Sequence, residues 1–310
     1  MSAERPNVFL RTKNAASRRW SALKRRYPAV RHVVDAWNLL QENNGNQYAA
    51  AISYFTFLAI FPLLLLAVAV TGFVLHAYPA TQRSLFDQIT QSVGGELATT
   101  LQSAVNTAIN QRTGVGIIGL VGVALIGLGW VGNIRAAIDA VWGRRPQQRN
   151  FFIGRLVNLL VLAGLGIGGL VSLGLTVVGT ALTDQILRAA DLEHVAGAHY
   201  LLKAVGLLLA VAGDLVIFWW LLVRLPSARV PRRVGLQGAL LAAVGFEVLK
   251  ILGTYIVAKT AHSATAGPFA SIVAVLVWIH LVALFLLFCA AWTVTCPGCA
   301  PIARRADSAG

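Results

Sequence analysis

Six long apolar stretches constrain this chain more than any other feature of its sequence. They cover residues 51–75, 114–132, 156–180, 204–223, 235–258 and 269–292, and each holds few or no charged side chains. About 20 residues of helix cross the hydrocarbon core of a bilayer, so each stretch is long enough to span a membrane. Because the backbone in lipid must satisfy its own hydrogen bonds, the sequence predicts an all-α polytopic membrane protein with six transmembrane helices.

The composition excludes several other classes of protein. Hydrophobic residues make up 57% of the chain and charged residues only 12%, about half the share of charged residues in an ordinary soluble domain. A soluble enzyme, a disordered tail protein and a secreted disulfide scaffold are therefore all ruled out.

The positive charge alternates between the two sides of the predicted membrane. The chain has a net charge of +14, and twenty of its 26 lysines and arginines lie in 1–50, in the segments after the second and fourth spans, and in the C-terminal tail. Short cytoplasmic loops carry this excess, so both termini are predicted to be cytoplasmic. The basic face then fits anionic lipid headgroups. We expect membrane lipids as partners and no nucleic acid.

Three regions follow from this pattern. Residues 1–47 are predicted to form a basic cytoplasmic arm and an interfacial amphipathic helix, residues 48–295 the transmembrane domain, and residues 296–310 a cytoplasmic tail. In the first region one helical face is apolar, with Val30, Val33, Val34, Trp37 and Leu40. The polar stretch before the first span is too long for a signal peptide, so that span is expected to be an uncleaved anchor.

The extracytoplasmic segment 76–113 has an apolar residue at every fourth position from Leu85 to Ile109. This spacing predicts one long or two shorter amphipathic helices, with a break at Gly94-Gly95. Such a segment could be a packed lid over the bundle or a gate over a substrate path.

Small residues and one proline stand out in two of the spans. Gly164, Gly168 and Ser172 lie four residues apart and give the third span a face of small side chains. Such a face allows close packing within one chain or in a homodimer, and less readily lines a cavity. Pro62 in the first span is a candidate hinge.

Ionisable residues interrupt three of the apolar stretches near their centres: Asp214, Glu247 with Lys250, and His280. A charge at mid-bilayer costs roughly 2.5–3.5 kcal/mol on insertion scales, so such groups face a partner or water. They could line a polar cavity for an anionic or amphiphilic solute, or relay protons. Alternatively, Glu247 and Lys250 pair, and the other two only hold helices together.

A second polar group ends the second span, where Asn133, Arg135 and Asp139 follow one another. Arg135 and Asp139 are four residues apart, a spacing that allows an ion pair on one helix. We treat these residues as structural or gating candidates at the cytoplasmic boundary.

Signatures of enzymes and cofactors are missing from the sequence. The six histidines do not cluster as catalytic metal ligands do, and neither a phosphate-binding loop nor a Gly-x-Ser-x-Gly motif occurs. Cys296 and Cys299 could form a redox pair or half a zinc site, but no second ligand pair accompanies them, so an incidental pair is favoured. We expect no enzyme activity, no metal and no cofactor.

Several motifs together resemble the YihY/BrkB family of bacterial inner-membrane proteins. They are the Phe-Pro run of the first span (Ala49–Leu66), the exit Arg224–Pro226, and the last span (Gly267–Leu281) with its Trp278. Gly245–Lys250 looks like the YhjD branch of the family. The resemblance covers about residues 30–295.

This resemblance implies a six-span inner-membrane protein. Members carry labels as virulence or serum-resistance factors, the YhjD branch is linked to envelope lipid export, and an older ribonuclease BN label is regarded as mistaken. The chain departs from the pattern at Cys289–Ala291, where a Gly-Ala-Glu motif is frequent, and at His280, where tyrosine is common.

Two functional hypotheses follow. In the first, the protein exports an envelope lipid or an amphiphilic anionic solute, using a polar cavity at the membrane midplane. In the second, it is a non-transporting structural or accessory subunit of an envelope-biogenesis machine.

Overall fold

The computed structural model describes residues 27–93, 95–143, 154–168, 196–226, 230–261 and 267–296, and all regular structure within these ranges is helical. The helices are α2 (Pro28–Glu42), α3 (Gly45–Ala77), α4 (Pro79–Val93), α5 (Gly95–Asn110), α6 (Arg112–Val141), α8 (Ala196–Val223), α9 (Arg232–Ala261) and α10 (Gly267–Val294). A further helix covers Gly154–Gly168. The all-α class predicted from the sequence is therefore confirmed for the described part of the chain.

In the part of the chain that the structure describes, four helical segments are long and apolar enough to cross a membrane: Gly45–Ala77, Arg112–Val141, Arg232–Ile256 and Ala270–Val294. They match the first, second, fifth and sixth predicted spans. Two shorter apolar helical segments, Gly154–Gly168 and Leu208–Val223, overlap the third and fourth predicted spans. The crossing of the membrane by these two segments, and the side on which the termini lie, stay predictions.

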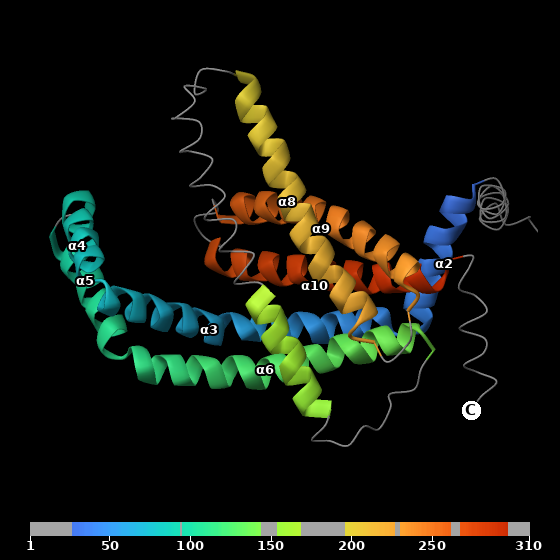
Figure 1. Ribbon diagram of the computed structural model, residues 1–310, viewed down its shortest axis with the longest axis horizontal. Coiled ribbons are helices and arrows are strands. Elements are labelled where there is room, and N and C mark those ends of the chain that lie inside the picture. Colours follow the sequence, from blue (N-terminus) through green and yellow to red (C-terminus); the bar gives the residue numbers. More distant parts are fainter. Residues whose placement is uncertain are drawn as a thin grey trace, which may run out of the picture.

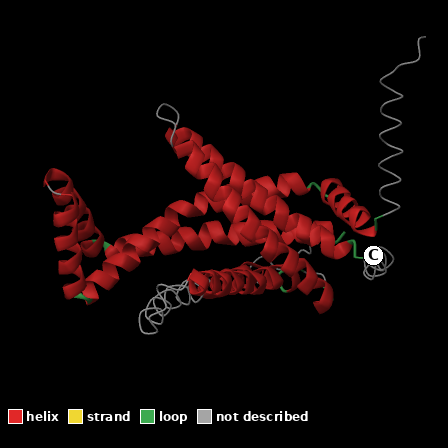
Figure 2. Cartoon of the chain, turned by 90° about the horizontal axis from the view of Figure 1, so that it is seen from above, coloured by secondary structure: helices red, strands yellow, loops and turns green. Residues whose placement is uncertain are grey.

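The long helices form two packed groups that meet along α10. Helices α3 and α6 run side by side, while α9 packs against both α8 and α10. Helix α10 also contacts α3 and so joins the two groups, and α8 crosses the others obliquely (Figure 1). Seen from above, the central helices lie along the long axis or slant across it (Figure 2).

Small residues bring α3 and α6 together. A Cβ at Gly119 would lie 2.9 Å from the backbone nitrogen of Leu66, and one at Gly122 would lie 2.7 Å from the Cβ of Pro62. Close approach of backbones through glycine is the usual way to pack helices in lipid, where apolar burial gives little driving force. Pro62, predicted as a hinge, is buried in this contact; its role in any motion stays a prediction.

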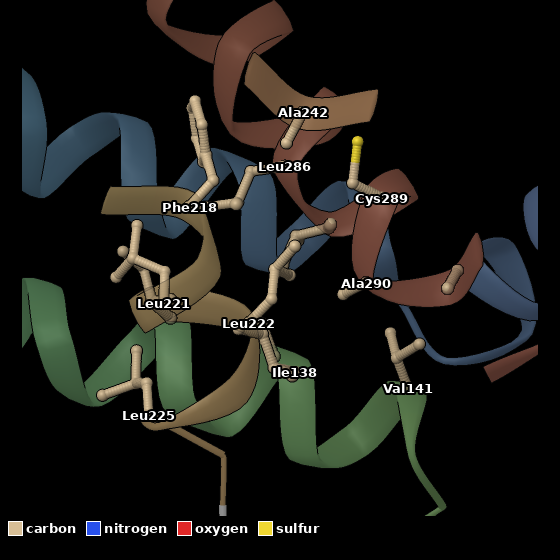
Figure 3. Close-up of a cluster of buried hydrophobic side chains, with 14 of the residues drawn as sticks. Ile138, Val141, Phe218, Leu221, Leu222, Leu225, Ala242, Leu286, Cys289 and Ala290 are labelled. Carbon is tan, nitrogen blue, oxygen red and sulfur yellow. The ribbon is translucent and has the colours of Figure 1, made fainter. Parts of the chain in front are cut away.

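A hydrophobic core joins helices from both groups. This cluster includes Ile138 of α6, Leu222 of α8, Ala242 of α9, and Leu286 and Cys289 of α10 (Figure 3). Many large apolar side chains elsewhere on these helices are exposed. This distribution suits helices whose outer faces meet acyl chains instead of water.

Helices α4 and α5 form a hairpin at one end of α3 and α6, turned away from the direction of those two helices (Figures 1 and 2). The chain breaks between them at Gly95, whose φ of +60° is a conformation that glycine adopts readily. The side-chain amide of Gln102 donates to Thr90 Oγ1 over 2.9 Å and so ties the two helices together. Of the two alternatives predicted for this segment, one long helix or two shorter ones, the structure has the second.

Helix α2 packs on the C-terminal part of α10. The His32 ring stacks on the Trp292 indole at 3.8 Å between centroids, and His32 Nε2 donates to the Trp292 carbonyl oxygen over 3.0 Å. Ala36 and Leu40 are fully buried on the same side, whereas Trp37 remains 43% exposed. The predicted helix is confirmed; its place at the membrane interface stays a prediction.

Candidate functional site

The side chain of Lys250 lies between two carboxylates. Its Nζ donates to Glu247 Oε1 over 2.7 Å and to Asp214 Oδ2 over 3.0 Å. Glu247 and Lys250 share α9, while Asp214 belongs to α8, so one ammonium group links two neighbouring helices. We call Asp214, Glu247 and Lys250 the charged trio.

Local geometry explains how the trio forms. Residues three apart on a helix lie on the same face, so Glu247 reaches Lys250 within α9. Phe246 lies one turn before Lys250, and its ring centroid is 5.1 Å from Nζ, a distance at which the ring attracts a cation. Phe218, one turn after Asp214 on α8, meets Phe246 edge-on at 5.5 Å between centroids. Two aromatic rings therefore form an apolar wall beside the trio.

The trio is charged, unbalanced and only partly covered by protein. The carboxylate side chains are each 17% exposed and the lysine side chain is 37% exposed. With all three groups ionised the formal charge is −1. A lysine ammonium has three hydrogen-bond donors, of which the carboxylates take two. The site could therefore accept one further proton or cation, or give up one carboxylate contact to an anion.

Trp278 holds α10 against α9, the helix of Glu247 and Lys250. Its indole Nε1 donates to the Leu249 carbonyl oxygen over 2.7 Å, one residue before Lys250. A Cβ at Gly253 would collide with this indole, so only glycine there lets the ring approach the backbone. Trp278 is a positioning residue for the turn of α9 that carries Glu247 and Lys250.

His280 forms its hydrogen bond with a residue outside the charged trio. Its Nε2 lies 3.1 Å from Asn46 Oδ1, at the beginning of α3. The structure thus brings together three of the four midplane candidates and places the histidine at a contact between α10 and α3. That contact is the kind of interhelical hydrogen bond that the structural interpretation proposed for His280.

The polar residues at the end of the second span lie apart from the trio. Asn133 Nδ2 donates to the Gly129 carbonyl on its own helix over 2.9 Å. Arg135 Nε donates to the Leu225 carbonyl over 3.1 Å, just past the end of α8, and so satisfies a carbonyl that has no helical partner. Asp139 is buried. A pairing of Arg135 with Asp139 stays a prediction.

The small-residue face of the third span is described only in part. A Cβ at Gly164 would collide with the Trp220 ring of α8, which makes Gly164 a packing position. A Cβ at Gly168 would have no described atom within 4 Å, and Ser172 lies outside the described residues.

The cysteines and metal-ligand residues can be placed in part. Cys289 is buried and Cys296 partly exposed, while Cys299 lies outside the described residues. Across the described ranges, no three His, Cys, Asp or Glu side chains are grouped so as to hold a metal ion.

Sequence reasoning missed two residues at these contacts. Phe246 lies four residues before Lys250, so the two side chains share one helix face. This spacing could have indicated the cation–π contact. The other, Asn46, lies just before the first apolar stretch, and nothing in its surroundings identifies His280 as its partner.

Comparisons with known proteins give a consistent result. The family model described as virulence factor BrkB matches residues 36–309. Inner membrane protein YhjD of Escherichia coli (strain K12) is 36% identical over 276 residues, covering 87% of this chain and 82% of that protein. A protein of Dickeya dadantii (strain 3937) is 34% identical over 89% of this chain and 86% of its own length.

More distant relatives are longer proteins. A UPF0761 membrane protein of Pseudomonas aeruginosa (strain LESB58) is 30% identical over 77% of this chain but only 56% of its own length. The chain therefore spans about half the length of such relatives. No solved structure matches.

Proposed function

Because the chain belongs to the BrkB family of membrane proteins, we propose that it is a multi-pass transporter of the bacterial inner membrane. Its substrate would be an envelope lipid or another amphiphile, and it would act without enzyme chemistry. The localisation is supported by the relative named an inner membrane protein and by the long apolar helices. The distribution of positive charge supports cytoplasmic termini.

The observation that carries this proposal is the charge imbalance of the trio. A single lysine and a single carboxylate would suffice to fasten α9 to α8, since they balance each other. The second carboxylate adds an uncompensated charge, and a charge in the bilayer costs roughly 2.5–3.5 kcal/mol on insertion scales. Its retention in apolar helices is best explained by a site that receives something during a working cycle.

The surroundings of the trio suit an amphiphilic substrate. On α9, Val248 and Ile251 directly follow Glu247 and Lys250 and are 61% and 72% exposed. An acyl chain could lie along these side chains while a polar headgroup meets the trio.

An anionic headgroup would require Lys250 to exchange partners, because both of its close contacts are carboxylates. The proposal therefore includes a step in which one carboxylate gives way to the substrate. This step distinguishes a transport site from a permanent fastening.

One observation favours a second function. The contact of Lys250 with Asp214 is an interhelical bond, and such bonds also hold helices together in proteins that transport nothing. In that case the protein would be a structural or accessory subunit of an envelope-biogenesis machine.

Lipid movement in proteoliposomes separates the two functions. The purified chain would be reconstituted with a trace of phosphatidylglycerol carrying a fluorescent headgroup-proximal label, and a membrane-impermeant quencher would report movement between leaflets. We expect movement above that of protein-free vesicles, and its loss in Asp214→Asn and Glu247→Gln.

The matched control is Asp87→Asn, which removes an exposed carboxylate on α4. It should move lipid like the unmodified chain. Folded trio variants that also move lipid at the unmodified rate would contradict the transporter and favour the accessory role.

A further inference from the structure

We infer that Asp214 is a proton-binding group whose protonation releases Lys250 from α8 and opens the charged trio to an anionic headgroup. The headgroup part of this inference rests on the proposed function. The proton-controlled contact between α8 and α9 does not, because it follows from the three side chains alone.

The geometry favours Asp214 over Glu247 as the site of protonation. Glu247 is the nearer partner of Lys250, at 2.7 Å against 3.0 Å, and it shares a helix with the lysine. The pair of Glu247 and Lys250 can therefore persist when α8 moves. Asp214 makes the longer hydrogen bond to Lys250 and belongs to the other helix. Protonation of Asp214 therefore costs less free energy than protonation of Glu247.

The proton balance is simple. A hydronium ion from the aqueous phase gives its proton to the Asp214 carboxylate and leaves as water. The trio then passes from a formal charge of −1 to neutral, which lowers the cost of holding it in the membrane. Lys250 keeps its bond to Glu247 and regains a donor that a phosphate or carboxylate headgroup can accept.

Among the side chains that the structure describes, Lys250 is the cation paired with Asp214. From α9 the nearby groups are Glu247 and Lys250; Tyr255 and Lys259 lie farther along the same helix, where they contact each other. Helix α10 carries two titratable groups: His280, which is bonded to Asn46, and Cys289, which is buried in the hydrophobic core. Helix Gly154–Gly168, which meets α8 at Trp220, carries Arg155 at its far end.

Release at Asp214 would be a local opening. Phe218 and Phe246 lie one turn away on the same two helices and meet at 5.5 Å between ring centroids. Their contact has no charge and does not respond to protonation. The two helices would therefore stay joined at the rings while the segment bearing Asp214 moves.

Distances between spin labels on α8 and α9 test the release without any substrate. Labels would be placed at Leu209→Cys and Ile251→Cys, both exposed positions, in a chain whose native cysteines are replaced. In liposomes at neutral pH we expect one short distance, and in acidic buffer a shift to longer distances. Asp214→Asn should show the longer distances at every pH, whereas Glu247→Gln should keep the pH response.

An infrared difference spectrum between acidic and neutral buffer provides a check in the unlabelled chain. We expect the carbonyl band of a protonated carboxyl group, weakened in Asp214→Asn and unchanged in Asp87→Asn. Distances independent of pH, or a pH response lost only in Glu247→Gln, would overturn the inference.

Binding of the labelled phosphatidylglycerol in detergent tests the headgroup step. Binding should tighten in acidic buffer in the unmodified chain and become independent of pH in Asp214→Asn; labelled phosphatidylcholine should show no such change. A pH-dependent distance without lipid movement would refute the proposed function and leave the proton site standing. Lipid movement with a pH-independent distance would refute the proton site and leave the proposed function standing.

Discussion

Lys250 of α9 donates a hydrogen bond to Asp214 of α8 over 3.0 Å, although 36 residues separate the two in the chain. The same ammonium group contacts Glu247 over 2.7 Å. The lysine therefore separates two like charges as well as linking two helices, and both carboxylates depend on it for a positive partner.

Removal of this lysine should destabilise the fold. Lys250→Ala leaves two carboxylates in an apolar helix pair without a counter-charge. Breaking a fully buried pair costs 3–5 kcal/mol, and we expect about 2 kcal/mol here because the side chains are partly exposed. Thermal unfolding in detergent measures the effect.

Adding Asp214→Asn to Lys250→Ala should restore part of the lost stability, since one of the two repelling charges disappears. If Lys250→Ala unfolds at the temperature of the unmodified chain, the ammonium does not stabilise the pair, and the charge argument fails.

The sequence predicts contacts within one helix better than contacts between two helices. The spacing of Glu247 and Lys250 on one helix indicates that they pair, and the structure contains this ion pair. The partner of a residue on another helix depends on how the helices are rotated, which hydropathy does not encode. For this reason the sequence places Asp214, Glu247, Lys250 and His280 in one group, whereas in the structure His280 meets Asn46.

A similar limit applies to the fold. Runs of apolar residues predict where α3, α6, α9 and α10 lie, because crossing length depends on composition alone. They do not predict that α3 packs on α6, which depends on the alignment of Gly119 and Gly122 with Pro62. The glycines of α6 are visible in the sequence, but their partner helix is not.

Gly119→Ala should weaken the packing of α3 on α6. The added methyl would lie 2.9 Å from the Leu66 backbone nitrogen, which cannot move without its helix. We expect a loss of about 1–3 kcal/mol, typical of overpacking, measured as a lower unfolding temperature. The control Gly114→Ala on the same helix has nothing within 4 Å of the new Cβ and should not lower stability; equal losses at both sites would contradict the packing argument.

The interhelical bond from Trp130 Nε1 to Thr56 Oγ1, 2.8 Å long, should contribute modestly. Interhelical hydrogen bonds in membrane proteins average about 0.6 kcal/mol. A double-mutant cycle with Trp130→Phe and Thr56→Val should give a coupling energy of that size. Additive effects of the two substitutions would show that the bond contributes nothing measurable.

Cysteine labelling in intact cells tests the cytoplasmic placement of the C-terminus. Cys296 follows α10 and is partly exposed, while Glu96 is exposed on α5. In single-cysteine variants, an impermeant maleimide that crosses only the outer membrane should label Glu96→Cys in intact cells. It should label Cys296 only after the inner membrane is opened, because the positive charge near that end resists translocation. Labelling of Cys296 in intact cells, with Glu96→Cys protected, would mean that the whole chain is inverted and that the α4–α5 hairpin lies in the cytoplasm.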